Sequence, residues 1–160
     1  PDFFYGLNFY FQYKGFDLTM FWQGIQGRDI ISDLKKETDL WSGLNIGFLN
    51  KGRRVLDAWT PNNPDSDIPA LTRSDLNNEK RVSTYYVEDG SFLKLRNIQI
   101  GYNVPEAALQ KVKMRKLRVY VSAQNLLTIK SRTFTGVDPE NPNYGYPIPM
   151  NLTFGVNIGF

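Results

Sequence analysis

The 160-residue chain has the length of one ordinary domain, and its 19 Lys and Arg against 16 Asp and Glu leave a net charge of +3. This surplus is too small to argue for nucleic acid as a partner. The chain contains no His and no Cys, which excludes disulfides, Cys/His metal centres and histidine-dependent catalysis. An aromatic fraction of 14%, concentrated in strand-like segments, favours an all-β protein.

The first strand is predicted over residues 3–13, where every second residue is apolar or aromatic. These residues are Phe3, Tyr5, Leu7, Phe9, Phe11 and Tyr13. The residues between them are mostly polar, and the length suits a tilted membrane β-strand. A tight turn at Lys14 and Gly15 leads into a second strand over 16–27. The pattern predicts a hairpin.

Residues 28–91 read as a long, charged connection that contains Trp41, Trp59 and a turn-rich run over 61–69. A loop of this length is uncommon within a compact soluble domain and indicates either a functional loop or a wrong assignment of the elements. A short helix is expected around 44–58, where one helical face would carry Leu44, Phe48, Leu49, Val55 and Leu56.

Three further strands are predicted over 92–102, 117–128 and 151–160. In the first of them the apolar positions change phase between Leu95 and Ile98, which indicates either a β-bulge or a strand that lies only partly in an apolar medium.

The connections between the strands alternate in length. Those at 14–15 and 103–116 are short, and those at 28–91 and 129–150 are long. The short connection 103–116 is basic and contains a helix start at Val104-Pro105-Glu106. Outer-membrane barrels have short periplasmic turns and long outer loops. This pattern predicts both long loops outside, and it makes the basic connector a solvated turn rather than a nucleic-acid site.

The alternative architecture is a soluble β-sandwich or barrel with an internal apolar core. The length and aromatic content of the apolar faces argue against it. Five strands do not close a spanning barrel of the usual kind, and open edges are not tolerated in hydrocarbon. The remaining strands are therefore expected N-terminal to this chain or on another polypeptide.

Several stretches carry a family resemblance. The first is YYVEDGSFLKLRNI over residues 85–98, which continues into GYNVP over 101–105. The second is LRVYVSAQNLLT over 117–128. The set is completed by DPE over 138–140, YPIP over 146–149 and the closing FGVNIGF. The stretch WTPNNP, followed by DIP, resembles a loop motif of the same proteins. Together they closely resemble the C-terminal end of SusC/RagA-family TonB-dependent outer-membrane transporters, over nearly the whole chain.

The resemblance implies an all-β transmembrane antiparallel barrel of 22 strands with a plugged lumen. Residues 1–160 would form about its last five strands, and the plug domain would lie elsewhere. It implies import of an oligosaccharide or peptide across the outer membrane of a Gram-negative, Bacteroidota-type bacterium, without enzyme activity or cofactor. The alternatives are a non-transporting outer-membrane β-subunit that completes another chain's barrel, and a siderophore-type TonB receptor.

The partners implied by the resemblance are several. A SusD-like surface lipoprotein would act as a lid, and TonB–ExbB–ExbD would act through the missing N-terminal part. Outer-membrane lipid would surround the barrel, and the barrel-assembly machinery would insert it.

Six aromatic residues are candidate functional residues. On the long loops, contacts with sugar rings or with the lid protein are expected from Trp41, Trp59, Tyr144 and Tyr146. Aromatic residues at such places also form interfacial girdles and brace loops. On the last strand, Phe154 and Phe160 resemble the signal that the barrel-assembly machinery reads, and that strand would pair with the first strand of the barrel.

No metal or catalytic site is expected. The oxygen-rich run 62–67 lacks the spacing of a calcium-binding loop. The acid pairs Asp65/Asp67 and Glu88/Asp89 are expected to be solvated, because no recognisable cleft accompanies them in the sequence.

Overall fold

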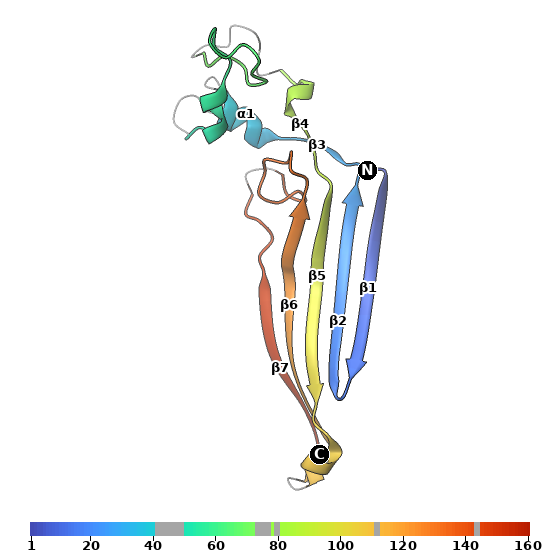
Figure 1. The fold of residues 1–160 in the computed structure, drawn as a ribbon. Coiled ribbons are helices and arrows are strands. Elements are labelled where there is room, and N and C mark those ends of the chain that lie inside the picture. Colours follow the sequence, from blue (N-terminus) through green and yellow to red (C-terminus); the bar gives the residue numbers. More distant parts are fainter. Residues whose placement is uncertain (41–49, 73–77, 79–80, 111–112, 143–144) are drawn as a thin grey trace. The chain divides into compact units, whose positions relative to one another are not determined.

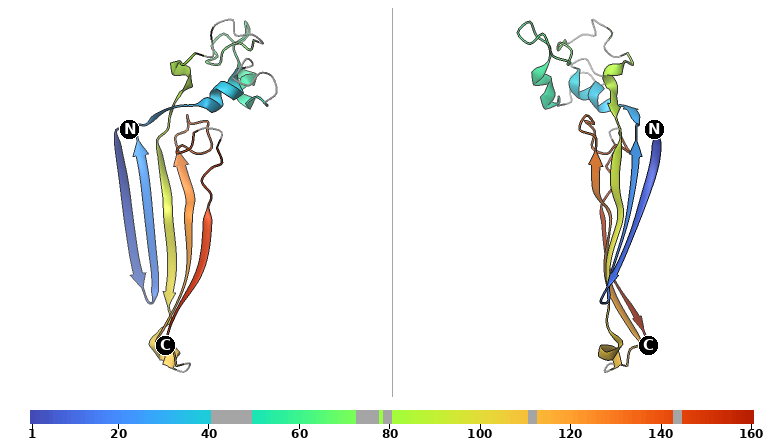
Figure 2. Two further views of the ribbon diagram at one scale, coloured as in Figure 1. Left: turned by 180° about the vertical axis from the view of Figure 1, so that it is seen from behind. Right: turned by 45° about the vertical axis from the view of Figure 1, so that its right-hand side comes forward.

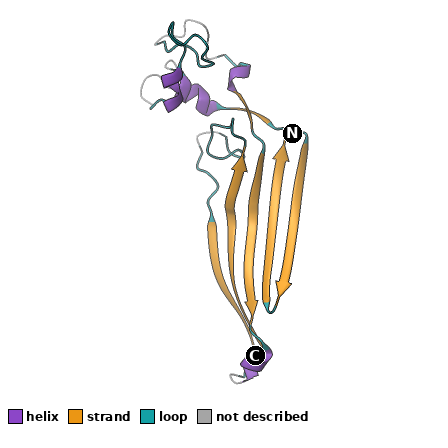
Figure 3. Cartoon of the chain, in the orientation of Figure 1, coloured by secondary structure: helices purple, strands orange, loops and turns teal. Residues whose placement is uncertain are grey.

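The computed structural model describes residues 1–40, 50–72, 78, 81–110, 113–142 and 145–160. These residues form two compact units. The sheet unit comprises Pro1–Arg28, Ser91–Ser131 and Ile148–Phe160. The loop unit comprises Asp29–Gly90 and Arg132–Pro147. Figure 3 shows the long strands of the sheet unit in orange.

The sheet unit is one five-stranded antiparallel sheet with the strand order β1-β2-β5-β6-β7. Its strands are β1 (Phe3–Tyr13), β2 (Phe16–Gln26), β5 (Phe92–Asn103), β6 (Lys116–Lys130) and β7 (Asn151–Gly159). They lie side by side in all three views of Figures 1 and 2. The predicted antiparallel all-β fold is confirmed.

A two-residue turn joins β1 to β2. Lys14 has φ 46° and Gly15 has φ 86°, and this pair of positive φ values matches the twist of a tight hairpin. Glycine adopts this conformation without steric cost. The Gly15 carbonyl accepts a hydrogen bond from the Asn103 backbone N–H at 2.8 Å, which ties the turn to the end of β5.

The strand register separates apolar from polar side chains across the whole sheet. Partners on adjacent strands share a face, and one row of partners consists of Phe11, Leu18, Ile100, Val121 and Phe154. The neighbouring row points to the opposite face and consists of Gln12, Asp17, Gly101, Tyr120 and Gly155. We call these the apolar face and the polar face.

The apolar face is exposed in this chain. Phe11 is 58% exposed and Phe154 is 76% exposed. An exposed apolar surface that runs across several strands marks a membrane or protein contact.

A β-bulge in β5 keeps this face continuous. The register of β5 shifts against β2 between Phe21 and Trp22, and it shifts against β6 between Leu95 and Asn97. The extra residue, Arg96, lets Leu95 and Ile98 lie on the same face although their spacing is odd. The bulge predicted from the phase change is therefore present.

In the loop unit, β3 (Asp29–Ile31) pairs with β4 (Val87–Asp89). Helix α1 (Asp33–Asp39) follows β3, and two short 3-10 helices cover Arg53–Asp57 (η1) and Thr84–Tyr86 (η2).

The helix expected around 44–58 is only partly testable, because residues 41–49 lie outside the described residues. The described part of that range contains η1 rather than an α-helix. Helix α1 was not predicted. In the sheet unit, α2 (Glu106–Leu109) follows Pro105, where the sequence indicated a helix start. No described helix has the length and hydropathy to cross a membrane.

Candidate functional site

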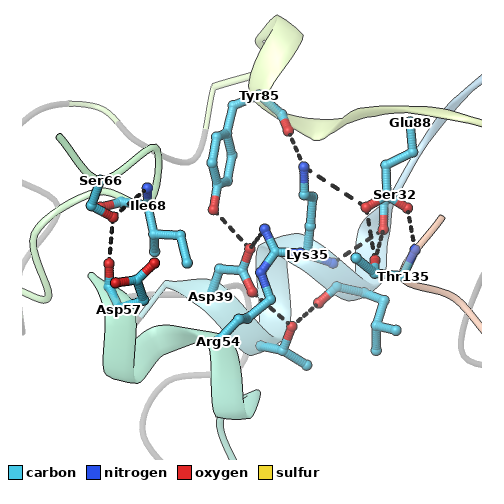
Figure 4. Close-up of polar contacts among 12 residues, drawn as sticks. Ser32, Lys35, Asp39, Arg54, Asp57, Ser66, Ile68, Tyr85, Glu88 and Thr135 are labelled. Carbon is cyan, nitrogen blue, oxygen red and sulfur yellow. Dashed lines mark hydrogen bonds and ion pairs between the residues drawn. The ribbon is translucent and has the colours of Figure 1, made fainter. Parts of the chain in front are cut away.

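The loop unit contains a buried carboxylate, Asp39, that binds two other segments of the chain. Its side chain is 0% exposed. The Tyr85 hydroxyl donates to Asp39 Oδ2 at 2.7 Å, and Arg54 Nη2 lies 2.9 Å from the same oxygen. Figure 4 shows the three side chains converging from α1, η1 and η2. Because a buried charge without partners is costly, these contacts hold the three elements together.

Tyr85 is a permanent donor in this cluster. Burial raises the pKa of the Tyr85 phenol well above its ordinary value, and the hydrogen bond to Asp39 raises it further. The phenol therefore keeps its proton throughout the neutral range. It neutralises no charge, but it supplies the hydrogen bond that the buried Asp39 oxygen needs.

A second buried carboxylate, Glu88, joins the two parts of the loop unit. Glu88 accepts hydrogen bonds from the Thr135 backbone N–H at 3.1 Å and from the Thr135 hydroxyl at 2.8 Å. Lys35 Nζ lies 3.7 Å from Glu88 Oε1 and donates to the Tyr85 carbonyl at 2.7 Å. These contacts connect residues 29–90 to residues 132–147 (Figure 4).

The expectation that Glu88 and Asp89 form a solvated pair is wrong for Glu88, whose side chain is 1% exposed. The two residues alternate along β4, so one side chain points inward while the other points to solvent. Asp89 is exposed, as expected. Glu88 is not solvated because Thr135, from the other long loop, packs against it and donates to its carboxylate.

Hydrogen bonds within the loop around Trp59 fix its shape. The Trp59 backbone N–H donates to the Ile68 carbonyl at 2.8 Å. The Asn63 side-chain amide donates to Asp57 Oδ1 at 2.9 Å, and the Ser66 hydroxyl donates to the Asp57 carbonyl. These polar side chains hold the loop shape, while the Trp59 side chain is 43% exposed.

The described residues contain no cluster of three or more His, Cys, Asp or Glu side chains placed to hold a metal ion. Asp65 and Asp67 are exposed.

The other predicted loop residues are placed as follows. Tyr146 lies in the loop unit and is 97% exposed. Trp41 and Tyr144 lie outside the described residues. Within the described part of the chain, Trp59 and Tyr146 make no ring contact with each other.

Phe154 and Phe160 lie in the sheet unit. Phe154 is on the apolar face of β7, and Phe160 directly follows that strand with 80% of its side chain exposed.

The polar face carries an ion pair that bridges three strands. Arg118 on β6 donates from Nε to Asp17 Oδ2 on β2 at 3.1 Å and from Nη2 to Asp17 Oδ1 at 2.5 Å. Asn103 on β5 donates to the same carboxylate at 3.2 Å. The bridge passes over Gly101, where a Cβ atom would lie 2.4 Å from Arg118 Nη2. A larger residue at this point of β5 would force the Arg118 guanidinium and the Asp17 carboxylate to shift.

Sequence reasoning missed the buried clusters around Asp39 and Glu88. Tyr85 and Glu88 stand in a stretch that carries the family resemblance, which was the available signal. No local pattern identifies Arg54 as the partner of Asp39 or Thr135 as the partner of Glu88, because each pair joins separate segments of a long connection.

The chain was compared with known proteins. No family model matches it. It is 35% identical to TonB-dependent receptor P3 of Formosa agariphila over 176 residues, which cover 100% of this chain and 16% of the receptor. It is 31% identical to TonB-dependent receptor P26 of the same organism over 175 residues, which cover 100% of the chain and 17% of that receptor.

Solved structures give the same result. The RagAB peptide transporter matches with a TM-score of 0.75 and 29% identity over 93% of this chain and 16% of its own. The RagAB peptide importer in an open-open state matches with a TM-score of 0.78 and 29% identity over 97% of this chain and 17% of its own.

The relatives are named as receptors and transporters, in agreement with the prediction that the chain is not an enzyme. The chain spans about one sixth of the length of the relatives it matches. In sequence and fold this chain is similar to one segment of TonB-dependent receptors, in agreement with the predicted resemblance to the C-terminal part of a SusC/RagA-family transporter.

Proposed function

We propose that this chain forms part of the wall of a nutrient importer in the outer membrane of a Gram-negative, Bacteroidota-type bacterium. The observation that carries the proposal is the five-strand row of partners Phe11, Leu18, Ile100, Val121 and Phe154. Lipid would cover this apolar face, and the polar face would line the lumen. The alternation of apolar and polar residues along every strand is typical of membrane barrels.

The connections support an orientation for the sheet. Both long connections leave from the end of the sheet where β2 and β6 finish, and the turn at 14–15 and the connector at 104–115 lie at the other end. We place the long loops 28–91 and 129–150 at the cell surface and the short connections in the periplasm, because outer-membrane barrels follow this rule.

The cargo we propose is a peptide or an oligosaccharide. The similarity to the RagAB peptide transporter supports a peptide. A SusD-like surface lipoprotein would cover the outer side, and TonB–ExbB–ExbD would drive import through parts of the receptor beyond this chain. Trp59 and Tyr146, exposed on the loop unit, are the described aromatic residues we assign to lid or cargo contacts.

Uptake in cells tests the importer proposal. Bacteria that lack the gene, and the same cells carrying it on a plasmid, are given labelled peptides, labelled oligosaccharides or a ferric siderophore. Loss of peptide or oligosaccharide uptake, restored by the plasmid and abolished without TonB, supports the proposal. Loss of siderophore uptake alone identifies the siderophore alternative, and unchanged uptake of all three compounds identifies a non-transporting subunit.

The partner proposal has its own test. The native receptor carries an affinity tag and is extracted in mild detergent, and co-purifying lipoprotein is quantified by mass spectrometry. The variant Trp59→Ala with Tyr146→Ala is expected to recover several-fold less lipoprotein or to import less cargo. The matched control is Leu56→Ala with Val82→Ala, which removes two exposed apolar side chains from the same unit. Equal losses in both variants would contradict the assignment of the two aromatic residues.

A further inference from the structure

The end of the sheet unit that carries the 14–15 turn has a basic cavity. Its volume is about 420 Å³. It is lined by the hairpin turn, by the start of the connector after β5 and by the first residues of β6, and its charged lining residues are Lys14, Glu106, Arg115 and Lys116. We call it the rim pocket. Three cations against one carboxylate give it a positive charge.

The cations of the rim pocket are available for an external anion. Lys14, Arg115 and Lys116 are exposed. None of them forms an ion pair with a carboxylate of the described residues, and Glu106 is not within ion-pair distance of any of them. The nearest partner of Lys14 is the Tyr13 ring, whose centroid lies 5.1 Å from Nζ. Ammonium and guanidinium groups placed this way bind phosphate oxygens by charge-assisted hydrogen bonds.

An apolar groove begins where the rim pocket ends. A cavity of about 310 Å³ on the apolar face is lined mainly by Phe16, Ile100, Tyr102, Val119, Val121 and Phe154. Phe16 directly follows Gly15 of the rim pocket, and Tyr102 directly precedes Asn103 of that pocket. The two cavities are therefore adjacent, the charged one at the ends of β5 and β6 and the apolar one further along the strands.

The two cavities together are complementary to an amphiphile, a molecule with a charged group and a hydrocarbon chain. The groove crosses β2, β5, β6 and β7. A phosphate group in the rim pocket would place the attached hydrocarbon against the groove, since Phe16 and Tyr102 of the groove directly adjoin residues of the pocket. Lys and Arg near a membrane surface attract anionic headgroups. Tyr102 lines the groove next to the rim pocket, and the Tyr13 ring lies against Lys14 of that pocket, at the end of the strands. Aromatic residues take such places at the level of lipid headgroups.

We propose that the rim pocket and the apolar groove together bind one anionic glycerophospholipid of the inner leaflet of the outer membrane. The headgroup phosphate is held by Lys14, Arg115 and Lys116, and one acyl chain lies against Phe16, Ile100 and Val121. The site lies at the periplasmic end of the wall, where Lys116, the first residue of β6 and in phase with the polar face, lines the rim pocket. This inference rests on the proposed membrane location.

The experiment uses the native full-length receptor in nanodiscs that contain equal amounts of phosphatidylglycerol and phosphatidylethanolamine. The receptor is released in the mass spectrometer, and the lipids that remain bound are counted. The wild type is expected to retain phosphatidylglycerol at least fivefold over phosphatidylethanolamine. The variant Lys14→Gln, Arg115→Gln, Lys116→Gln is expected to show no preference.

A matched control removes three exposed cations of the loop unit: Arg53→Gln, Arg81→Gln, Arg132→Gln. It is expected to keep the wild-type preference. Equal preference in both triple variants overturns the site. Displacement of the retained lipid by inorganic phosphate also overturns it, because a soluble anion would then suffice. Receptor that does not insert into the nanodisc at all refutes the membrane location instead, so the two failures are distinguishable.

Discussion

Asp39 shows how single side chains hold a long loop in one shape. Its carboxylate is completely buried, yet it lies at the end of a seven-residue helix that would not be stable alone. Arg54 balances its charge and Tyr85 supplies a neutral donor. The carboxylate thus connects three short elements, none of which has an apolar core of its own large enough to fix it.

Tyr85→Phe is expected to loosen this connection. The change removes one hydrogen bond to a buried charge and keeps the ring, so the cost is on the order of 1–3 kcal/mol in local stability. Hydrogen–deuterium exchange of the native receptor checks it: amides of α1 and η2 should exchange faster. Tyr146→Phe, at a fully exposed ring, serves as the control and should leave exchange unchanged. Equal exchange in wild type and Tyr85→Phe would show that the hydroxyl contributes nothing.

The raised pKa of Tyr85 adds a pH dependence. The folded unit keeps the phenolic proton above pH 10, where an unfolded tyrosine loses it. The contribution of the Tyr85 phenol to the stability of the loop unit is therefore fully present below about pH 10. It falls as the pH rises from there toward the folded pKa of the phenol. Exchange of α1 amides, corrected for intrinsic rates, should accelerate over this alkaline range in the wild type. In Tyr85→Phe the acceleration should be absent or smaller.

Phe160 is the residue we assign, together with Phe154, to recognition by the barrel-assembly machinery. Both rings are exposed, and they follow the phase of the apolar face on β7. Deletion of Phe160 is expected to lower the amount of folded receptor in the outer membrane several-fold. Heat-dependent gel mobility measures that amount, and Val156→Ala, on the same strand and face, is the control. Normal levels after the deletion would refute the assignment.

At the scale of elements, the strands were predictable because each carries its own information. A period of two with one apolar face fixes which side chains share the apolar face, and a slip by one residue would reverse them all. The five strands lie within two residues of the predicted ranges. Even the bulge at Arg96 was visible, because it shifts the phase of the pattern.

The elements of the loop unit were not predictable in this way. Helix α1 has no apolar stripe, and the visible signals were the capping Ser32, whose side chain accepts from the Lys35 backbone N–H, and Asp33 in the first turn. What stabilises α1 comes from Arg54 and Tyr85, in other segments of the same long loop. A pattern search along the chain does not find such contacts.

Gly101→Ala is expected to break the bridge between β2, β5 and β6. The added methyl group would collide with Arg118 and Asp17 and separate their charge-assisted hydrogen bonds, at a cost on the order of 1–3 kcal/mol. The temperature at which the folded receptor is lost on gels should fall. Gly159→Ala, where the added Cβ would lie 3.3 Å from the Lys116 Cβ and touch no ion pair, should have a much smaller effect. A similar fall in both variants would show that the ion pair is not what the substitution disturbs.

At the scale of the whole molecule, the sheet has two open edges in this chain. β1 pairs only with β2, and β7 pairs only with β6, among the described residues. An unpaired backbone edge is not stable in hydrocarbon, because its N–H and C=O groups have no water to bind. The chain also spans about one sixth of its relatives. Both observations favour pairing of β1 and β7 with further strands of the native receptor.

This pairing predicts how the edges behave in the complete protein. Amides of β1 and β7 should be protected from hydrogen–deuterium exchange to the same degree as amides of the central β5. Denaturing mass spectrometry of the same sample should give a polypeptide several times larger than 18.4 kDa. Fast exchange along β1 or β7 in the detergent-solubilised receptor would contradict a closed wall. A mass near 18.4 kDa with protected edges would instead mean that a second polypeptide supplies the neighbouring strands, because slow exchange at both edges requires partners on both sides.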